Sequence, residues 1–206
     1  LAAFKKDLPA LREEACREAE EMIAPRQISS GRYPVIFSER LARDFIGLLA
    51  DTFCADAVQK GDSPWEGRLG ETIASSGITL RDDAHLSGAL ANSAWDDEGA
   101  ATGSTVIIEK GVLKTFLYDI YTARVDGTKT TGNANRSGSG AVSPGYWNFY
   151  LKPGEKSLKE LLMETKDGLY LTELMGLHTI DIATGVFSLA ASGFKIEKGV
   201  LAHAVN

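Results

Sequence analysis

The chain has 206 residues, 44% hydrophobic and 24% charged, which is enough to bury a core and unlike a disordered chain. Its net charge of −6 argues against nucleic-acid binding as its main task, because phosphate contacts need a basic face. We see no apolar run of membrane-spanning length and no signal-peptide pattern, so no membrane partner is expected. The two cysteines lack C-x-x-C spacing and are typical of reduced thiols, so we expect a cytoplasmic protein.

The first predicted element is a helix that Asp7 caps, with Pro9 in its first turn and Pro25 beyond its end. Its apolar stripe at spacings of three and four comprises Leu8, Leu11, Ala15, Ala19, Met22 and Ile23. A short strand is predicted over 33–37, and Ser38 then caps a second helix. The buried face of that helix is expected to carry Leu41, Phe45, Leu48, Leu49 and Phe53.

The remaining pattern is mostly β, with one further helix. Ser157 and Glu160 form a capping box, and Gly168 is expected to close the helix that they open. Strands are predicted at 78–81, 105–108, 112–119, 120–125, 149–151, 169–172, 187–188, 194–197 and 200–205, with loops at 60–77, 82–103, 127–146 and 176–185. Hairpin signals cluster after residue 100, so we predict an α+β fold with helices on a mainly antiparallel sheet.

The hexapeptide Ile-Glu-Lys-Gly-Val-Leu occurs at 108–113 and again at 196–201. Its flanks differ between the two copies. An apolar–charged–turn–apolar string with a well-placed glycine is what a tight hairpin requires. We therefore predict two similar hairpins in preference to an internal repeat.

The residues that could carry chemistry are few. A hydrolytic zinc needs about three protein ligands. The chain has 3 histidines and no H-E-x-x-H, so we expect no complete zinc site. Cys54 is interpreted as a packed thiol on the second helix, and Cys16 as an unreactive thiol among acids. The segment 136–140 is interpreted as a flexible loop in preference to a phosphate loop.

Two groups of polar residues leave a functional role open. The acidic run 96–98 could bind a cation, although a turn-forming role is favoured. Glu173 has apolar neighbours in the sequence and would need a partner such as Arg124 or Arg136, with an ion pair favoured over catalysis. His178 lies in a loop, where a functional and a structural role are equally open.

Several motifs recur in a characteristic order along the chain. They are Asp96-Asp97-Glu98-Gly99, then 106–113, 121–124, 130–134, 172–179, 184–188 and Gly193-Phe194. In this order and spacing the chain resembles the C-terminal part of the TldD/PmbA family, long labelled modulator of DNA gyrase, from Tyr33 to Asn206. The resemblance implies a helical lead-in from a preceding N-terminal domain over 1–30. It also implies a C-terminal domain over 31–206, truncated at its C-terminal end.

The family resemblance implies a function. TldD and PmbA (TldE) are the halves of a cytosolic heterodimeric metallopeptidase that degrades unfolded or extended peptides, and the TldD half carries H-E-x-x-x-H on the helix after the first strand. The corresponding segment here, Leu41–Leu49, has neither histidine nor the glutamate, and no cysteine occurs at 177–184. The resemblance thus places the chain with the PmbA half, with no cofactor of its own and zinc expected in a TldD partner.

The resemblance also supplies partners and site candidates, although no catalytic residue is identified. The expected partners are a TldD-like subunit or a second copy, together with a peptide. The candidates for a peptide groove are Asp97, Glu98, Gly99, Thr131, Gly132, Asn133, Glu173, Gly176, His178, Thr179 and Gly185. Two alternatives stay open: a non-enzymatic peptide- or protein-binding module, and an independent enzyme that uses Glu173 and His178.

Overall fold

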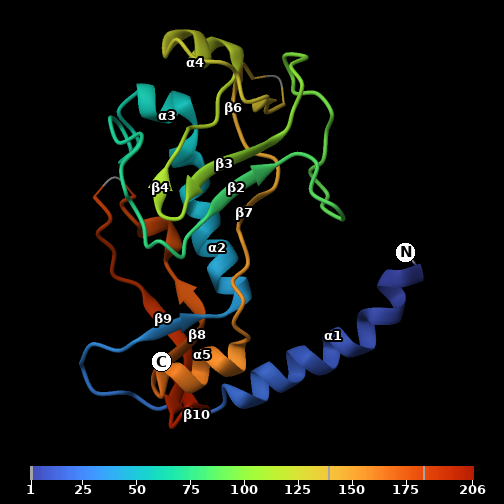
Figure 1. Cartoon of the computed structure of the whole chain (residues 1–206). Coiled ribbons are helices and arrows are strands. Elements are labelled where there is room, and N and C mark those ends of the chain that lie inside the picture. The colour runs from blue at the N-terminus through green and yellow to red at the C-terminus, as the bar shows by residue number, and fades with distance from the viewer. Residues whose placement is uncertain (1, 139, 183) are drawn as a thin grey trace. The chain divides into compact units, whose positions relative to one another are not determined.

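The computed structural model describes the backbone of residues 2–138, 140–182 and 184–206, and their side chains apart from those of 2–7 and 178. Helices and mainly antiparallel sheets confirm the α+β prediction (Figure 1). The helices are α1 (Ala2–Glu21), α2 (Glu39–Leu49), α3 (Ala55–Gln59), α4 (Ile120–Val125), α5 (Leu158–Thr165), and the 3-10 helices η1 (Ala50–Phe53) and η2 (Leu177–Thr179). The strands are β1 (Val35–Phe37), β2 (Leu80–Asp83), β3 (Ser104–Glu109), β4 (Val112–Leu113), β5 (Ala134–Arg136), β6 (Val142–Pro144), β7 (Phe149–Leu151), β8 (Asp167–Met175), β9 (Ala190–Glu197) and β10 (Val200–Val205).

The chain divides into two compact units. The first unit comprises 1–42, 155–179 and 188–206, and the second comprises 43–154 and 180–187. The first unit contains a sheet in the order β1-β8-β9-β10, in which only β1 runs parallel to its neighbour. The second unit contains the antiparallel sheet β4-β3-β2-β7 and the hairpin β5-β6.

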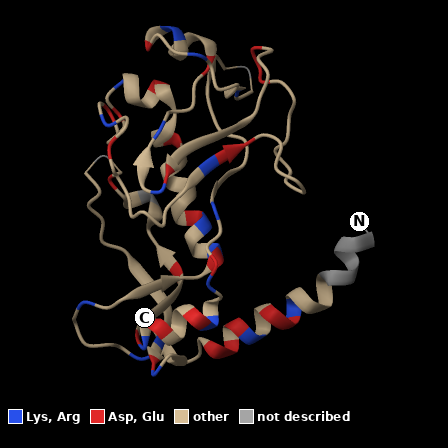
Figure 2. Cartoon of the chain, in the orientation of Figure 1, with Lys and Arg blue, Asp and Glu red and all other residues tan. Residues whose placement is uncertain are grey.

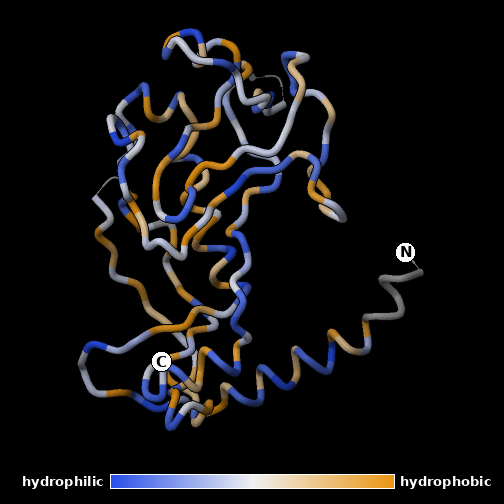
Figure 3. The backbone as a smooth tube through the Cα atoms, in the orientation of Figure 1, coloured by the Kyte–Doolittle hydropathy of each residue, from blue (hydrophilic) through white to orange (hydrophobic). Residues whose placement is uncertain are grey.

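A continuous apolar core lies in the second unit. Figure 3 shows hydrophobic residues concentrated along β3 and β4, which supply Ile107, Ile108 and Leu113 to this core. Phe53 stacks on Trp65 with ring centroids 5.4 Å apart. This core supports the loops that carry several of the candidate site residues.

The repeated hexapeptide forms two similar hairpins, as predicted. In the β3-β4 hairpin Lys110 and Gly111 have φ angles of 48° and 85°. In the β9-β10 hairpin Lys198 and Gly199 have φ angles of 51° and 80°. Positive φ at both central residues is what a type I′ turn requires, so the same local sequence gives the same turn in two different sheets.

The predicted strand over 120–125 is wrong, because this segment is helix α4. Asp119 caps the helix: its Oδ1 accepts the backbone N–H of Thr122 at 2.7 Å and the Thr122 hydroxyl at 2.7 Å. Thr122 Oγ1 accepts the Asp119 N–H in return. This reciprocal capping box outweighs the β preference of Ile, Tyr, Thr and Val in a short segment.

Other predicted boundaries are corrected as well. Helix α1 begins at Ala2 and contains Pro9, and its described residues up to Glu21 are all exposed, so the chain itself does not bury the predicted stripe. Figure 2 shows acidic and basic residues along the coloured part of this helix. Helix α5 ends at Thr165, its C-cap Lys166 has a φ of 59°, and Gly168 lies in β8. A Cβ at Gly168 would approach Pro34 O to 2.6 Å.

The predicted loops 82–103 and 127–146 also contain strands. β2 continues through Asp83, and β5 pairs with β6 inside the second segment. Among the described helices, none has the length and apolarity needed to cross a membrane.

Candidate functional site

The acidic motif at 96–98 is a turn bound to β5. Asp96 is buried, and its Oδ1 accepts the N–H groups of Glu98 at 3.0 Å and Ala100 at 2.8 Å. Its Oδ2 accepts the Ala134 N–H at 3.1 Å. Asp97 Oδ2 accepts the Arg136 N–H at 2.7 Å. These two carboxylates therefore hold the turn against β5, in agreement with the favoured turn-forming role.

Glu98 extends the same motif to helix α4. Its Oε2 accepts the N–H of Ile120 at 2.7 Å. Ile120 is the first residue of α4, and N–H groups in the first turn lack partners within the helix. A carboxylate at this end also interacts favourably with the helix dipole. Glu98 thus tethers the acidic turn to α4.

The segment 131–133 packs directly against the same turn. Gly132 has a φ of 72°, and a Cβ there would lie 2.3 Å from the Ala101 carbonyl oxygen. Its own carbonyl accepts the indole N–H of Trp147 at 3.0 Å. Thr131 Oγ1 accepts the Tyr118 N–H at 2.8 Å. Only glycine meets both demands at position 132, a left-handed backbone and a close approach of another segment.

Asp82 is the residue that sequence reasoning missed. It is 1% exposed, and its Oδ2 accepts the Asn133 side-chain amide at 2.7 Å while its Oδ1 accepts the Trp147 N–H at 2.8 Å. Burial raises its pKa, although the hydrogen bonds from Asn133 and Trp147 offset part of that effect. The predicted loop begins at residue 82, whereas β2 continues through Asp83 and alternation along the strand turns Asp82 to the same buried side as Leu80.

These contacts make up one hydrogen-bonded assembly in the second unit, which we call the motif network. It joins β2, the acidic turn, the 131–133 segment and the start of α4. Its members are Asp82, Asp96, Asp97, Glu98, Thr131, Gly132 and Asn133. Gly99, with a φ of 76°, lies in the acidic turn and donates its N–H to Asp96 O at 3.0 Å.

The remaining candidates lie outside this network. Glu173 is exposed on β8 opposite Ser192, and the described residues of its own unit include no ion-pair partner for it. Arg124 and Arg136 belong to the other unit, so their pairing with Glu173 stays a prediction. An exposed carboxylate is hydrated and needs no partner. Gly185 lies in the second unit with a φ of 68°.

The end of β8 in the first unit leads into a short 3-10 turn. Gly176 has a φ of 87°, and its carbonyl accepts both the N–H and the hydroxyl of Thr179 at 2.8 Å. The side chain of His178 lies outside the described residues. Gly176 and Thr179 therefore form a local turn.

The motif network is suited to orienting loops. Each of its carboxylates accepts one or more N–H groups.

Cys54 is buried, and burial together with the charges of Asp51, Asp56 and Asp82 raises its pKa to about 12, which opposes thiolate chemistry. Over the described side chains, no group of three or more His, Cys, Asp or Glu could hold a metal ion.

The comparisons with known proteins agree on one family. The model of the PmbA/TldA metallopeptidase C-terminal domain matches residues 30–206. A metalloprotease of Methanocaldococcus jannaschii is 34% identical over 195 residues, which cover 94% of this chain and 43% of that protein. Metalloprotease PmbA of Escherichia coli is 30% identical, with coverage of 94% and 41%. The chain thus spans less than half the length of these curated relatives.

Solved structures give the same result. A Thermotoga maritima protein named as a candidate modulator of a DNA gyrase superposes with a TM-score of 0.84 and 37% identity, covering 92% of this chain and 43% of that one. TldE from Thermococcus kodakarensis superposes with a TM-score of 0.82 and 27% identity, covering 97% and 46%. The chain therefore belongs to the PmbA/TldD metallopeptidase family, through a match to its C-terminal domain.

Proposed function

We propose that this chain is the C-terminal domain of a PmbA/TldE-like subunit that works with a TldD-like subunit in the proteolysis of unfolded or extended peptides. In this proposal the zinc belongs to the TldD-like subunit, and the present chain contributes peptide-binding surface and subunit contacts in the cytoplasm. The observation that carries the proposal is the sequence of α2. No residue from Leu41 to Leu49 is a histidine, although the TldD half is expected to carry its zinc motif there.

The architecture of the motif network supports this division of labour. Its carboxylates are engaged in holding loops, and none is paired with a hydroxyl or thiol nucleophile of the described residues in a way that would support acyl transfer. A rigid, loop-orienting assembly of this kind suits a supporting subunit. Glycines such as Gly132 permit the close backbone approaches by which these loops pack together.

An extended peptide could bind by adding a strand to an open sheet edge. In the second unit β7 is an edge strand, and its Tyr150 lies opposite Arg81 of β2. In an antiparallel ladder the backbone groups of alternate residues point to opposite sides, so those of Phe149 and Leu151 point away from β2. Apart from the ladder with β2, we find no backbone hydrogen bond of these two residues within the described chain. Main-chain pairing would bind peptides with little sequence preference.

Metal content tests the division of labour between subunits. The complete protein, purified without chelators, is expected to contain far less than one zinc per chain, while a TldD-like partner purified in the same way contains about one. Stoichiometric zinc in this protein, together with peptide cleavage by the protein alone that a chelator abolishes, would overturn the proposal.

The name of the Thermotoga maritima relative supports a second candidate function, a non-enzymatic protein-binding module that acts without a protease partner. Affinity purification from the source cells separates the two. Recovery of a TldD-like subunit supports the first function, and recovery of gyrase without such a subunit supports the second.

A further inference from the structure

One buried donor in the second unit has no hydrogen-bond partner among the described residues. The Arg81 Nε atom is shielded from solvent. Among the described side chains, it is the one buried nitrogen or oxygen atom that makes no hydrogen bond. The other end of the guanidinium is held, because its Nη2 donates to Ser104 Oγ at 3.1 Å. A buried orphan donor is costly, and native proteins retain few of them. Arg81 therefore needs an explanation beyond its own sheet.

Arg81 lies on the face of the sheet that points away from the core. Along β2, Leu80 and Asp82 are buried while Arg81 and Asp83 are half-buried, as expected when alternate residues point to opposite faces. The residues opposite Arg81 are Val106 on β3 and Tyr150 on β7. Both are uncharged, so the cross-strand neighbours of Arg81 offer its charge no counterion.

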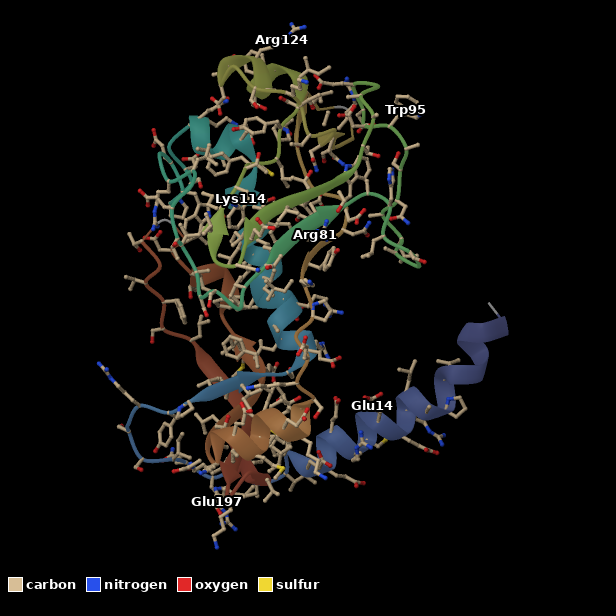
Figure 4. The ribbon with its side chains drawn as sticks, in the orientation of Figure 1. Glu14, Arg81, Trp95, Lys114, Arg124 and Glu197 are labelled. Carbon is tan, nitrogen blue, oxygen red and sulfur yellow. The ribbon has the colours of Figure 1, made fainter. Side chains whose placement is uncertain are left out.

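The one acid on the same strand face is engaged elsewhere. Asp83 Oδ1 accepts the His85 N–H at 2.8 Å. Among the described residues no carboxylate lies within ion-pair distance of Arg81. Figure 4 labels Arg81 on β2, and Figure 2 shows basic and acidic colour side by side along that strand. The guanidinium is thus oriented by Ser104 and lacks a counterion.

A carboxylate is the group that such a guanidinium recognises. Arginine presents its Nε and Nη donors as a planar fork that matches the two oxygens of a carboxylate. A strand added to the open edge of β7 would lie about 10 Å from β2, since neighbouring strands are about 4.8 Å apart. Its residue opposite Tyr150 would present a side chain on the Arg81 face. Together an arginine and a glutamate side chain span that separation.

We propose that Arg81 is a carboxylate-recognition site that selects acidic peptides, either through an acidic side chain or through the C-terminal carboxylate, when the peptide pairs with the edge of β7. This inference rests on the proposed peptide-binding function. It adds a substrate preference to that function, which otherwise predicts binding with little dependence on sequence.

The test measures peptide binding, not cleavage. Fluorescence anisotropy with the complete protein and its TldD-like partner would compare four labelled, unstructured peptides: Glu or Gln at the centre, each with a free or an amidated C-terminus. Arg81→Met is expected to weaken binding of the peptides whose carboxylate Arg81 recognises about tenfold. The affinity for the peptide with Gln and an amidated C-terminus, which carries neither carboxylate, should stay within about twofold of the wild-type value. Arg81→Lys, which keeps the charge and loses the fork, should give an intermediate loss.

Controls and outcomes separate this inference from the proposed function. Arg124→Met, at an exposed arginine on α4, should leave all four affinities unchanged, and the melting temperature of each variant verifies folding. If Arg81→Met lowers the affinity only for peptides with a free C-terminus, Arg81 recognises the terminal carboxylate. If it lowers the affinity only for peptides with Glu, Arg81 recognises the acidic side chain. If the wild type binds all peptides equally and Arg81→Met changes none, the Arg81 site is overturned while peptide binding stands. If the wild type binds no peptide, both fail.

Discussion

Asn133 donates its side-chain amide to Asp82 across 2.7 Å, and this hydrogen bond joins β2 to a segment 51 residues later in the chain. The same amide also donates to the Gly145 carbonyl at 3.1 Å. Both donors of the amide are therefore used, and the Asp82 carboxylate accepts from Asn133 and from the Trp147 backbone. Because this contact is buried, the motif network depends on it for the mutual placement of its loops.

Asp82→Asn is expected to destabilise the protein by about 1–3 kcal/mol near neutral pH, because the new amide would place a donor against the Asn133 amide. The effect should depend on pH. Burial raises the folded pKa of Asp82 above the unfolded value of about 3.9, so protonation stabilises the folded state. The stability that Asp82 contributes is therefore full below the unfolded pKa and declines as pH rises through the folded pKa.

Urea denaturation of wild type and Asp82→Asn across a pH series measures this dependence. The difference in free energy of unfolding between the two proteins should shrink as pH rises above about 4 and then become constant. A difference that grows with pH would show that the folded state prefers the ionised carboxylate.

Gly132→Ala should cost about 2–5 kcal/mol, because the substitution combines a left-handed backbone with overpacking against a neighbouring carbonyl. The added Cβ would lie 2.3 Å from Ala101 O. Gly99→Ala is the matched control, since Gly99 has a similar φ of 76° and nothing within 4 Å of the added Cβ. It should cost only about 1–2 kcal/mol. Equal losses in chemical denaturation would contradict the close approach at position 132.

Asp119→Ala should destabilise the protein by about 1–2 kcal/mol, because it removes the buried cap of α4. Ser157→Ala removes the corresponding capping-box residue of α5 in an exposed setting and should cost less. Thermal and chemical denaturation of the two variants compare them directly. A larger loss for Ser157→Ala would mean that burial does not strengthen the α4 cap.

The two cysteines should differ in reactivity. Cys16 is exposed and Cys54 is buried with its pKa raised to about 12, so a thiol reagent at pH 8 should modify Cys16 in preference to Cys54 in the folded protein, although the acids around Cys16 slow its reaction. Cys16→Ser should abolish the native labelling, and Cys54→Ser should leave it unchanged. Mass spectrometry after denaturation should then find both thiols of the wild type modified. Rapid native labelling of Cys54 would contradict its packing.

The sequence predicted best where a local signal agrees with the tertiary setting. The Lys-Gly turns and the Ser157 capping box were predicted because each signal lies within a few residues. Helix α4 differs from the predicted strand because its residues favour β structure individually, while the capping box at Asp119 favours a helix. Asp82 was missed because its partners, Asn133 and Trp147, are distant in the chain. The family motifs name candidate residues that are scattered along the chain, and only long-range hydrogen bonds reveal that five of them form one network: Asp97, Glu98, Thr131, Gly132 and Asn133.

The orphan Nε of Arg81 could not be predicted from sequence at all. A strand arginine beside two aspartates suggests an ion pair. In the structure Asp82 faces the core and Asp83 accepts the His85 N–H, so neither neutralises Arg81. Side-chain alternation along β2 separates charges that are adjacent in the chain.

Reconstitution tests the central claim most directly. An unstructured peptide is incubated with the complete protein alone, with a TldD-like subunit alone, and with both, and cleavage is followed by mass spectrometry. The account predicts negligible cleavage by this protein alone and strong cleavage by the mixture, which is lost when the glutamate of the partner's H-E-x-x-x-H motif is changed to glutamine. Metal-dependent cleavage by this protein alone, at a rate that the partner does not alter, would contradict it.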